Sequence, residues 1–306
     1  MSLVAFSPPP ALPDFITRHL PFRRAVYTLR QGLDAGRKIH FIDQGGPGAR
    51  PVLLLHGNPT WSFLWRKVIA LLPGFRCVAP DLLGLGLSDR LPRIEDHTPE
   101  RHAGAIAELV EALDLREVIL VGQDWGGSFG ALAGARVPDR IAGMVFANAV
   151  VSIPTHPKPS FFHHFSHVPL LSDLVFRGLG FPQIALWAVQ GDKRSIRGDV
   201  ARAYRWPLRT WADRIAPLAL ARLVPSRQDR TWEVLRQGDL WVRSFSGPMA
   251  LVWGMRDPIL GRALRRHERD YPQAPVTRTQ AGHFLQEEVP EALAAAIEDM
   301  AGITAP

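Results

Sequence analysis

The chain has 306 residues, of which 46% are hydrophobic and 21% are charged, and its formal net charge is +7. These proportions are typical of a globular protein and argue against both a disordered chain and a membrane-spanning one. The first residues lack the basic region and long apolar stretch of a secretory signal, and the single Cys77 cannot form an internal disulfide, so we expect a cytoplasmic protein. Because no long Lys/Arg block is present, no nucleic-acid partner is expected.

Short apolar runs alternate with helical patterns from about residue 36 to 150. This alternation is typical of a mostly parallel sheet covered by helices on both faces. The sequence predicts strands at 38–43, 51–57, 76–81, 116–122 and 141–149, with helices between them at 61–72, 99–115 and 127–138. The run 116–122 contains REVILVG, whose continuous apolar part is that of a central strand buried on both faces.

The alternation stops after Ala149, and strand signals are absent from about Ser152 to Gly238. Pro, Phe and Trp are interleaved there with short amphipathic segments, which predicts a helical cap inserted after the strand 141–149. The alternation then resumes with a strand at 247–254, a helix at 259–271, a strand at 274–280 and a helix at 288–300. We therefore expect an α/β fold in which residues 1–151 and 239–306 form the main domain and residues 152–238 form the cap.

The segment VILVGQDWGGSFG places Asp124 on a sharp turn between a buried strand and a helix. Small residues surround this turn, as in the G-x-S-x-G nucleophile elbow, in which the central side chain is pushed into the open. Asp124 could also be a simple N-cap of the following helix, because Asp is favoured at that position. The elbow alone therefore leaves a nucleophile and a helix cap as two interpretations.

Two further residues favour the nucleophile. Asp257 follows the strand 247–254 in WGMRDPIL, and His283 follows the strand 274–280 in QAGHFLQEE. The order nucleophile, acid, histidine is the one used by hydrolases with such an elbow. Because ligands bind at the carboxyl ends of strands in open α/β sheets, we expect the three loops to meet there.

A second group of residues lies around LLLHGNPTWSFLW. Asn58 occupies the loop that supplies one backbone N–H of an oxyanion hole, and Trp125, directly after Asp124, supplies the other. Their side chains also offer an amide N–H and an indole N–H, which are neutral donors suited to a leaving anion. The alternatives are that NPT is only a turn and that Trp125 only packs in the core.

The segments HGNPTWSFLW, PDLLGLGLSD, VGQDWGG, WGMRDP and AGHFLQEE together resemble haloalkane dehalogenases of the α/β-hydrolase superfamily over residues 36–300. The resemblance implies that Asp124 is the nucleophile, His283 the base and Asp257 the acid, with Asn58 and Trp125 as halide-stabilising residues. Some members place the acid at the end of the strand 141–149, which has no acidic residue here. Others use a tryptophan of the cap for the halide, for which this chain offers Trp187, Trp206 and Trp211.

A carboxylate is already ionised at neutral pH, so Asp124 can attack without a base. The predicted reaction displaces halide from an sp³ carbon, forms an alkyl ester on Asp124, and hydrolyses that ester with water activated by His283. The partners are then a small apolar haloalkane and a halide ion, without a cofactor, metal or membrane. A cluster with His156, His163, His164 and His167 has no cysteine or carboxylate that would support a metal site.

Three other functions share parts of this pattern. Epoxide hydrolases resemble this chain in their aspartate nucleophile but protonate the epoxide with cap tyrosines, and of the three tyrosines only Tyr204 falls in the expected cap. The β-lactone decarboxylases of olefin biosynthesis resemble dehalogenases in all three catalytic residues and stay open as an alternative. A non-catalytic ligand receptor on the same scaffold is a third possibility, against which the intact set of catalytic residues argues.

Overall fold

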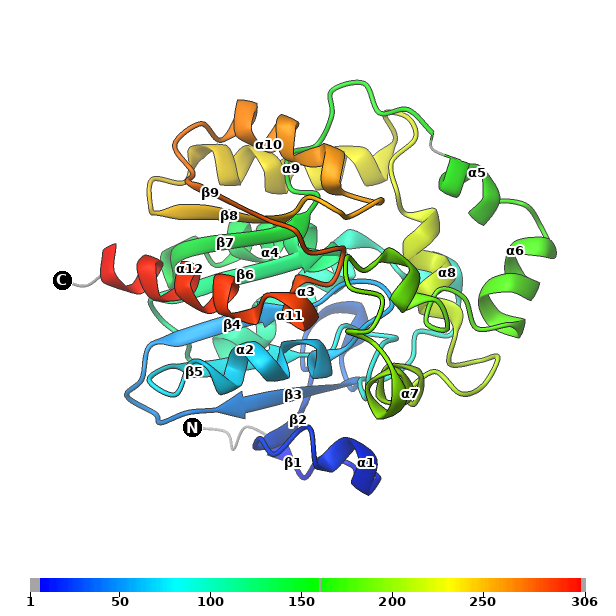
Figure 1. Ribbon diagram of the computed structural model, residues 1–306, viewed down its shortest axis with the longest axis horizontal. Coiled ribbons are helices and arrows are strands. Elements are labelled where there is room, and N and C mark those ends of the chain that lie inside the picture. The colour runs from blue at the N-terminus through cyan, green and yellow to red at the C-terminus, as the bar shows by residue number, and fades with distance from the viewer. Residues whose placement is uncertain (1–5, 160, 304–306) are drawn as a thin grey trace.

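A nine-stranded sheet with strand order β1-β2-β3-β5-β4-β6-β7-β8-β9 forms the centre of the computed structural model, which describes residues 6–159 and 161–303 (Figure 1). The strands from β5 to β9 in this order are parallel, whereas β1, β2 and β3 are antiparallel at one edge. The strand bounds are β1 Phe6–Ser7, β2 Arg24–Thr28, β3 Lys38–Gln44, β4 Pro51–Leu55, β5 Arg76–Pro80, β6 Val118–Asp124, β7 Ile141–Ala149, β8 Met249–Gly254 and β9 Val276–Thr279. The predicted α/β architecture is confirmed.

Helices cover both faces of this sheet (Figure 1). One face carries α2 (Arg66–Ala70), α11 (Leu285–Glu288) and α12 (Pro290–Ile303). The other face carries α3 (Pro99–Ala112), α4 (Trp125–Arg136) and α9 (Arg230–Ser244). Among the helices of the described ranges, none has the length and apolar character needed to cross a membrane.

The central strands are buried in the middle of the sheet because they carry apolar side chains on both of their faces. In β4, Val52 and Leu54 pack into the cluster under α2 and α12, while Leu53 and Leu55 pack into the cluster under α3 and α4. Successive side chains of a strand point to opposite faces, so a continuous apolar run can be buried only when both faces are covered. All four of these side chains are at most 1% exposed.

The segment between β7 and β8 contains helices and turns, without a strand in its described part. The helical pieces are α5 Phe161–Ser166, α6 Leu171–Asp173, η5 Leu174–Gly178, η6 Leu186–Val189, α7 Gly198–Arg205 and α8 Ile215–Arg222, followed by α9. Helix α9 crosses the expected cap boundary at residue 238 and packs against α4 in the helical layer of the sheet. The division into a cap at 152–238 and a main domain therefore stays a prediction, with α9 lying across its boundary.

Buried polar contacts hold α7 against the α2 and α11 side of the sheet. Glu287 of α11 receives two hydrogen bonds from Arg66, at 2.6 and 2.8 Å, and one from the Tyr204 hydroxyl of α7, at 2.5 Å. The indole N–H of Trp61 donates to the carbonyl of Ala203 at 3.1 Å. A buried charge is stable only when its partners are in place, so these contacts fix where α7 sits.

Candidate active site

Asp124 lies at the tip of a strained turn where β6 ends and α4 begins. Its φ is +52°, a left-handed value that is rare for a residue with a side chain and is found preferentially at functional sites. A Cβ at Gly122 would lie 2.5 Å from the Cα of Gly127, and one at Gly126 would lie 2.1 Å from the carbonyl oxygen of Leu55. The glycines on either side of Asp124 are therefore required by the close approach of α4 to the sheet.

The carboxylate of Asp124 makes no capping hydrogen bond to α4, although it occupies the N-cap position. One of its oxygens, Oδ1, instead accepts a hydrogen bond from the backbone N–H of Asn58 at 2.9 Å. A side-chain cap would have to accept from an N–H in the first turn of the helix. The structure thus does not support the interpretation of Asp124 as a simple helix cap.

The loops after β6, β8 and β9 bring Asp124, Asp257 and His283 together at the carboxyl edge of the sheet. His283 Nδ1 lies 2.8 Å from Oδ2 of Asp257, and His283 Nε2 lies 3.6 Å from Oδ2 of Asp124. Asp257 and His283 are buried, with exposed fractions of 6% and 1%. The imidazole therefore lies between the two carboxylates, with one ring nitrogen directed at each.

These two carboxylates control the protonation of His283. Burial alone would lower the pKa of the imidazole, but the charges and hydrogen bonds of Asp257 and Asp124 outweigh it and raise the pKa to about 10. Loss of either negative charge would therefore lower the pKa of His283.

Asn58 and Trp125, the predicted pair of donors, both lie beside Asp124: the backbone N–H of Asn58 donates to its carboxylate, and Trp125 follows it in the chain. The side-chain amide of Asn58 donates to the carbonyl of Pro217 at 3.0 Å, while its Oδ1 is buried without a partner. Trp125 stacks on Phe129 with ring centroids 5.1 Å apart, and within the described ranges its indole N–H makes no hydrogen bond. A second amide hydrogen of Asn58 and the indole N–H of Trp125 are thus the donors left for a ligand.

The cap tryptophans lie elsewhere. Trp187 and Trp211 are about half exposed at the surface of the cap, and Trp206 lies under the guanidinium of Arg209 at 5.0 Å. In the described structure, no hydrogen bond or ring contact joins any of the three to Asp124 or Trp125. The geometry therefore favours Asn58 over a cap tryptophan as the partner of Trp125.

Asn148 at the end of β7 is a site residue that the sequence analysis did not identify. Its amide donates to Oδ2 of Asp257 at 2.9 Å and to the carbonyl of Gly282 at 3.0 Å, and its Oδ1 accepts from the N–H of Gly254 at 2.8 Å. One signal in the sequence could have identified Asn148. It is a polar residue near the end of an apolar strand, at the same sheet edge as the loops of Asp257 and His283. Asn148 ties the loops of Asp257 and His283 to β7.

Gln123 is a second residue that was missed. Its side chain is fully buried, and its Nε2 lies 3.2 Å from the carbonyl oxygen and 3.4 Å from Nε2 of His283. An amide donor at this place holds the histidine loop from the side of β6. The sequence signal was its position directly before Asp124, at the end of the strand that leads into the elbow.

With this geometry established, comparison with known proteins defines the class. Residues 50–290 match the alpha/beta hydrolase fold family, so the chain is an α/β-hydrolase. It is 32% identical over 264 residues to a haloalkane dehalogenase of Mycolicibacterium paratuberculosis, covering 82% of this chain and 83% of that one. It is 31% identical to haloalkane dehalogenase 2 of Mycobacterium bovis, over 98% of this chain and 99% of that one. The chain belongs to the haloalkane dehalogenase family.

Solved structures agree with this assignment. The tetrameric haloalkane dehalogenase DpaA from Paraglaciecola agarilytica NO2 superposes with a TM-score of 0.78 at 25% identity, covering 96% of this chain and 98% of that one. Haloalkane dehalogenase DatA from Agrobacterium tumefaciens C58 gives a TM-score of 0.78 at 27% identity, covering 92% and 97%. The shared fold therefore extends over nearly the whole of both neighbours.

Proposed function

We propose that this enzyme hydrolyses the carbon–halogen bond of haloalkanes to an alcohol, a halide ion and a proton. The observation that carries the proposal is the contact of the elbow carboxylate of Asp124 with the buried pair of His283 and Asp257. Family membership and the donors at Asn58 and Trp125 support it. In this proposal Asp124 is the nucleophile, His283 the base and Asp257 the acid.

The first step is an in-line displacement. An oxygen of Asp124 attacks the carbon that bears the halogen, the carbon–oxygen bond of an alkyl ester forms, and the carbon–halogen bond breaks with its electron pair leaving on the halide. The N–H groups of Asn58 and Trp125 stabilise this anion as its charge grows. Fixed donors aimed at developing charge are usually the largest contribution to catalysis.

The second step hydrolyses the ester. Because the ester removes the charge of Asp124, the pKa of His283 falls from its raised value, and the neutral imidazole takes a proton from water. The resulting hydroxide attacks the carbonyl carbon of Asp124, the alcohol leaves, and the carboxylate is restored. Asp257 orients the imidazole through Nδ1 and stabilises its cation.

Replacement of His283 by Phe tests this scheme directly. The variant is expected to react with 1-bromobutane and to keep the butyl ester, which intact-protein mass spectrometry detects as an added butyl group. Asp124→Ala is the control and is expected to give neither adduct nor bromide. The covalent scheme would be wrong if the native enzyme released bromide while His283→Phe formed no adduct.

The alternatives receive less support. Tyr204, which an epoxide hydrolase would use as an acid, is fully buried and donates its hydroxyl to Glu287. The relatives reported above are haloalkane dehalogenases, and none of them supports a β-lactone decarboxylase or a ligand receptor. Parallel assays of halide release from bromoalkanes and of carbon dioxide release from a β-lactone separate the first two activities.

The proposed partners are an apolar haloalkane and the halide product. We further propose the cytoplasm as the site of the reaction, which the buried, unpaired thiol of Cys77 supports. Fractionation of cells that produce the chain without a tag, with the halide-release assay on each fraction, tests this localisation.

A further inference from the structure

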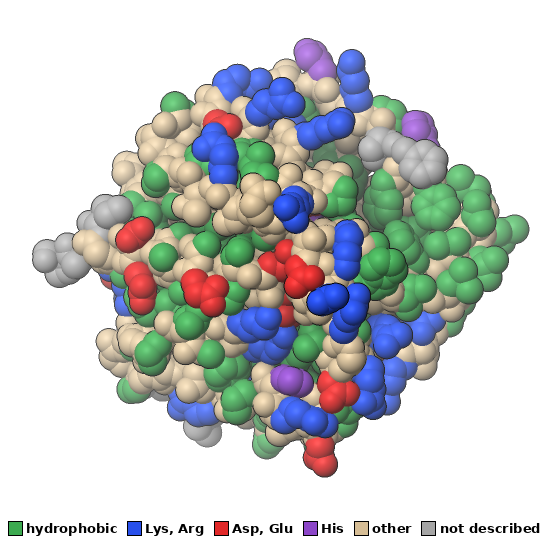
Figure 2. Space-filling model, in the orientation of Figure 1, with side chains coloured by type: hydrophobic (Ala, Val, Ile, Leu, Met, Phe, Trp, Pro, Cys, Tyr) green, Lys and Arg blue, Asp and Glu red, His purple; other side chains and the backbone are tan. Residues whose placement is uncertain are grey.

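Exposed apolar side chains are concentrated on one part of the cap. Among the described residues, fourteen large hydrophobic side chains are exposed, and eight of them lie between residues 168 and 214, a segment called the cap face below. Figure 2 shows hydrophobic side chains gathered at the right edge of the molecule, over the cap helices of Figure 1. These eight are Val168, Leu170, Leu171, Leu174, Leu179, Ile184, Trp187 and Trp211. Scattered exposed apolar residues are ordinary, whereas such a concentration marks an interaction surface.

The cap face is also basic. Its residues 168–214 include eight arginines and lysines against four aspartates, a net charge of +4 out of the +7 of the whole chain. In the described structure, six of the eight cations have no carboxylate within ion-pair distance: Lys193, Arg194, Arg197, Arg205, Arg209 and Arg214. Cations that have no carboxylate partner in the described structure keep their positive charge uncompensated and attract an external anion.

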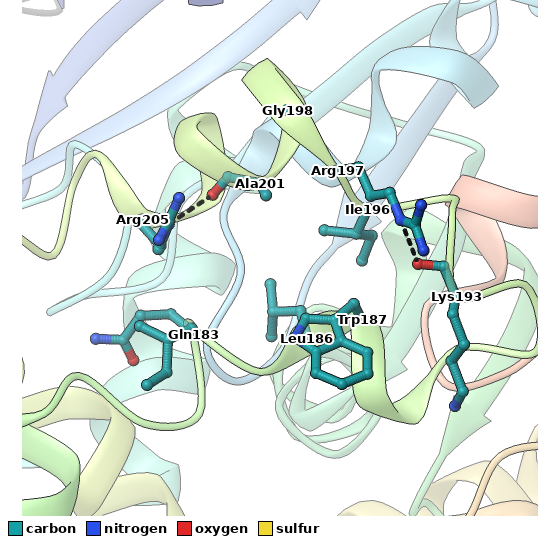
Figure 3. A pocket seen from close by; sticks show the side chains of 10 residues that line it. Gln183, Leu186, Trp187, Lys193, Ile196, Arg197, Gly198, Ala201 and Arg205 are labelled. Atoms are coloured by element: carbon teal, nitrogen blue, oxygen red, sulfur yellow. Dashed lines mark hydrogen bonds between the residues drawn. The ribbon is translucent and has the colours of Figure 1, made fainter.

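A hollow of about 540 Å³ between η6 and α7 combines both properties (Figure 3). The apolar side chains of Leu186 and Trp187 form one part of its wall, and Lys193, Arg197 and Arg205 lie around it. These three cations make hydrogen bonds only to backbone carbonyls in the described structure, those of Ala188, Lys193 and Ala201. Gln183, at 4% exposure, also lines the hollow, and both of its polar atoms lack a partner.

Apolar and basic groups adjoin one another around this hollow. Ile184 and Arg205 line the hollow and also a neighbouring one of about 410 Å³, which Arg209 and Arg214 border as well. Arg214 in turn donates to the carbonyl of Arg177, whose guanidinium lies 4.5 Å from the ring centre of Trp211. The basic groups therefore adjoin the exposed side chains of Ile184, Trp187 and Trp211, and Figure 2 shows cations along the border of the apolar patch.

We propose that the cap face docks on the surface of an anionic phospholipid bilayer. Exposed Leu and Trp side chains insert at the boundary between headgroups and acyl chains, while arginines and lysines contact lipid phosphates. A second copy of the chain, seated face to face, would bring two surfaces of net charge +4 together, which is unfavourable. A nucleic acid would pair with the basic groups but would leave the apolar side chains in water. The composition predicted no membrane partner, because net charge and mean hydropathy do not show that these residues share one face.

Vesicle co-sedimentation of the full chain tests the proposal. Vesicles of phosphatidylcholine alone are compared with vesicles that contain phosphatidylglycerol as a minor component, each at low and high salt. We expect at least tenfold stronger binding to the anionic vesicles, a blue shift of tryptophan emission on binding, and weakening at high salt because the basic groups are screened. Binding that depends neither on phosphatidylglycerol nor on salt would overturn the proposal.

Paired variants locate the contact. Leu170→Asp with Leu179→Asp removes two apolar side chains that are 84% and 63% exposed, and is expected to abolish vesicle binding. Leu33→Asp, at an 85% exposed position in η1 (Gly32–Asp34), is the matched control and is expected to bind like the native chain. Equal loss in the control would show a general effect of charge and would contradict docking through the cap face.

The basic groups are tested in the same way. Arg197→Glu with Arg205→Glu is expected to reduce binding at least tenfold, whereas Arg262→Glu with Arg265→Glu, an equal change of charge at exposed positions outside the cap face, is expected to reduce it much less. Sedimentation velocity of every variant gives its oligomeric state. If the native chain does not bind vesicles but forms an oligomer that Leu170→Asp with Leu179→Asp dissociates, a second copy covers the face and the lipid proposal is wrong.

Discussion

Asn148 donates its side-chain amide to Oδ2 of Asp257, the same carboxylate oxygen that lies 2.8 Å from Nδ1 of His283. The other oxygen of Asp257 accepts from the backbone N–H of Ile259 at 2.7 Å. Both oxygens are therefore held by donors other than the imidazole. The strand end of β7 thus contributes to the orientation of the proposed base, although it carries no ionisable group.

Replacing Asn148 by Ala is expected to slow ester hydrolysis by about tenfold and to leave alkylation nearly unchanged, because outer-shell hydrogen bonds of this kind typically contribute on that scale. Single-turnover mass spectrometry with 1-bromobutane measures the two steps separately, and the butyl adduct should accumulate in the variant. A uniform loss in both steps, or a lowered melting temperature that accounts for the loss, would show that Asn148 acts only on folding.

The two steps are expected to depend differently on pH. Alkylation requires only the carboxylate of Asp124, so its rate should be flat from pH 6 to pH 9. Hydrolysis requires neutral His283, so its rate should rise with pH and then level off. The apparent pKa of this rise should be lower than the value of about 10 in the free enzyme, because the ester has removed the charge of Asp124. Quenched-flow measurement of adduct formation and decay across this range checks both profiles.

The donors at the halide position are expected to act on alkylation. Asn58→Ala should slow adduct formation by about a hundredfold, since removal of one preorganised donor costs about 3 kcal/mol in comparable sites. Trp125→Phe keeps the stacking on Phe129 while removing the indole N–H, and a loss of similar size is expected. Bromide binding measured by tryptophan fluorescence should weaken in the Asn58 variant. Unchanged adduct formation in both variants would remove these residues from the proposed mechanism.

Buried His267 is expected to make the fold sensitive to acid. Burial lowers its pKa to about 4, and its Nε2 accepts from the N–H groups of Val151 and Ser152 at 3.1 and 3.3 Å. The unfolded chain binds a proton near pH 6.5 and the folded chain only near pH 4, so stability falls as pH decreases between these values, by up to about 3 kcal/mol.

Urea unfolding at pH 7 and pH 4.5 measures this effect. His267→Gln keeps a hydrogen-bonding side chain but cannot titrate, so the difference in unfolding free energy between the two pH values should be smaller in the variant than in the native chain. An identical pH dependence in the two proteins would assign the acid sensitivity to other groups.

The sheet and the elbow were predictable because local signals coincide with the final environment. The predicted strand 141–149 has the same bounds in the structure, since the mostly apolar run that follows Arg140 can be buried only where both faces of a sheet are covered. By contrast, the short antiparallel strand β2, which lies between β1 and β3, was not identified, because its partly buried pattern RAVYT resembles an irregular segment. Its position in the sheet depends on pairing with β1 on one side and with β3 on the other.

Contacts between side chains that are far apart in the sequence could not be predicted from local sequence patterns. The amphipathic pattern of α9 indicates a helix but not the layer it covers, which is set by contacts with α4. The roles of Asn148 and Gln123 depend on hydrogen bonds to loops more than a hundred residues away. The carboxylates, the histidine and the donors Asn58 and Trp125 could be selected from the sequence, because each follows a predicted strand and its chemistry limits what it can do at a sheet edge.

The hydrogen bonds of Glu287 to Arg66 and Tyr204 have a consequence for protein engineering. A chimera that exchanges only residues 152–238 with those of a relative would remove Tyr204 while retaining Arg66 and Glu287, and would leave an incomplete polar network under the graft. Transplants should therefore carry Trp61, Arg66 and Glu287 along with the foreign segment. The unit that can be exchanged between relatives is therefore defined by the buried polar network. The first and last residues of the insertion do not define it.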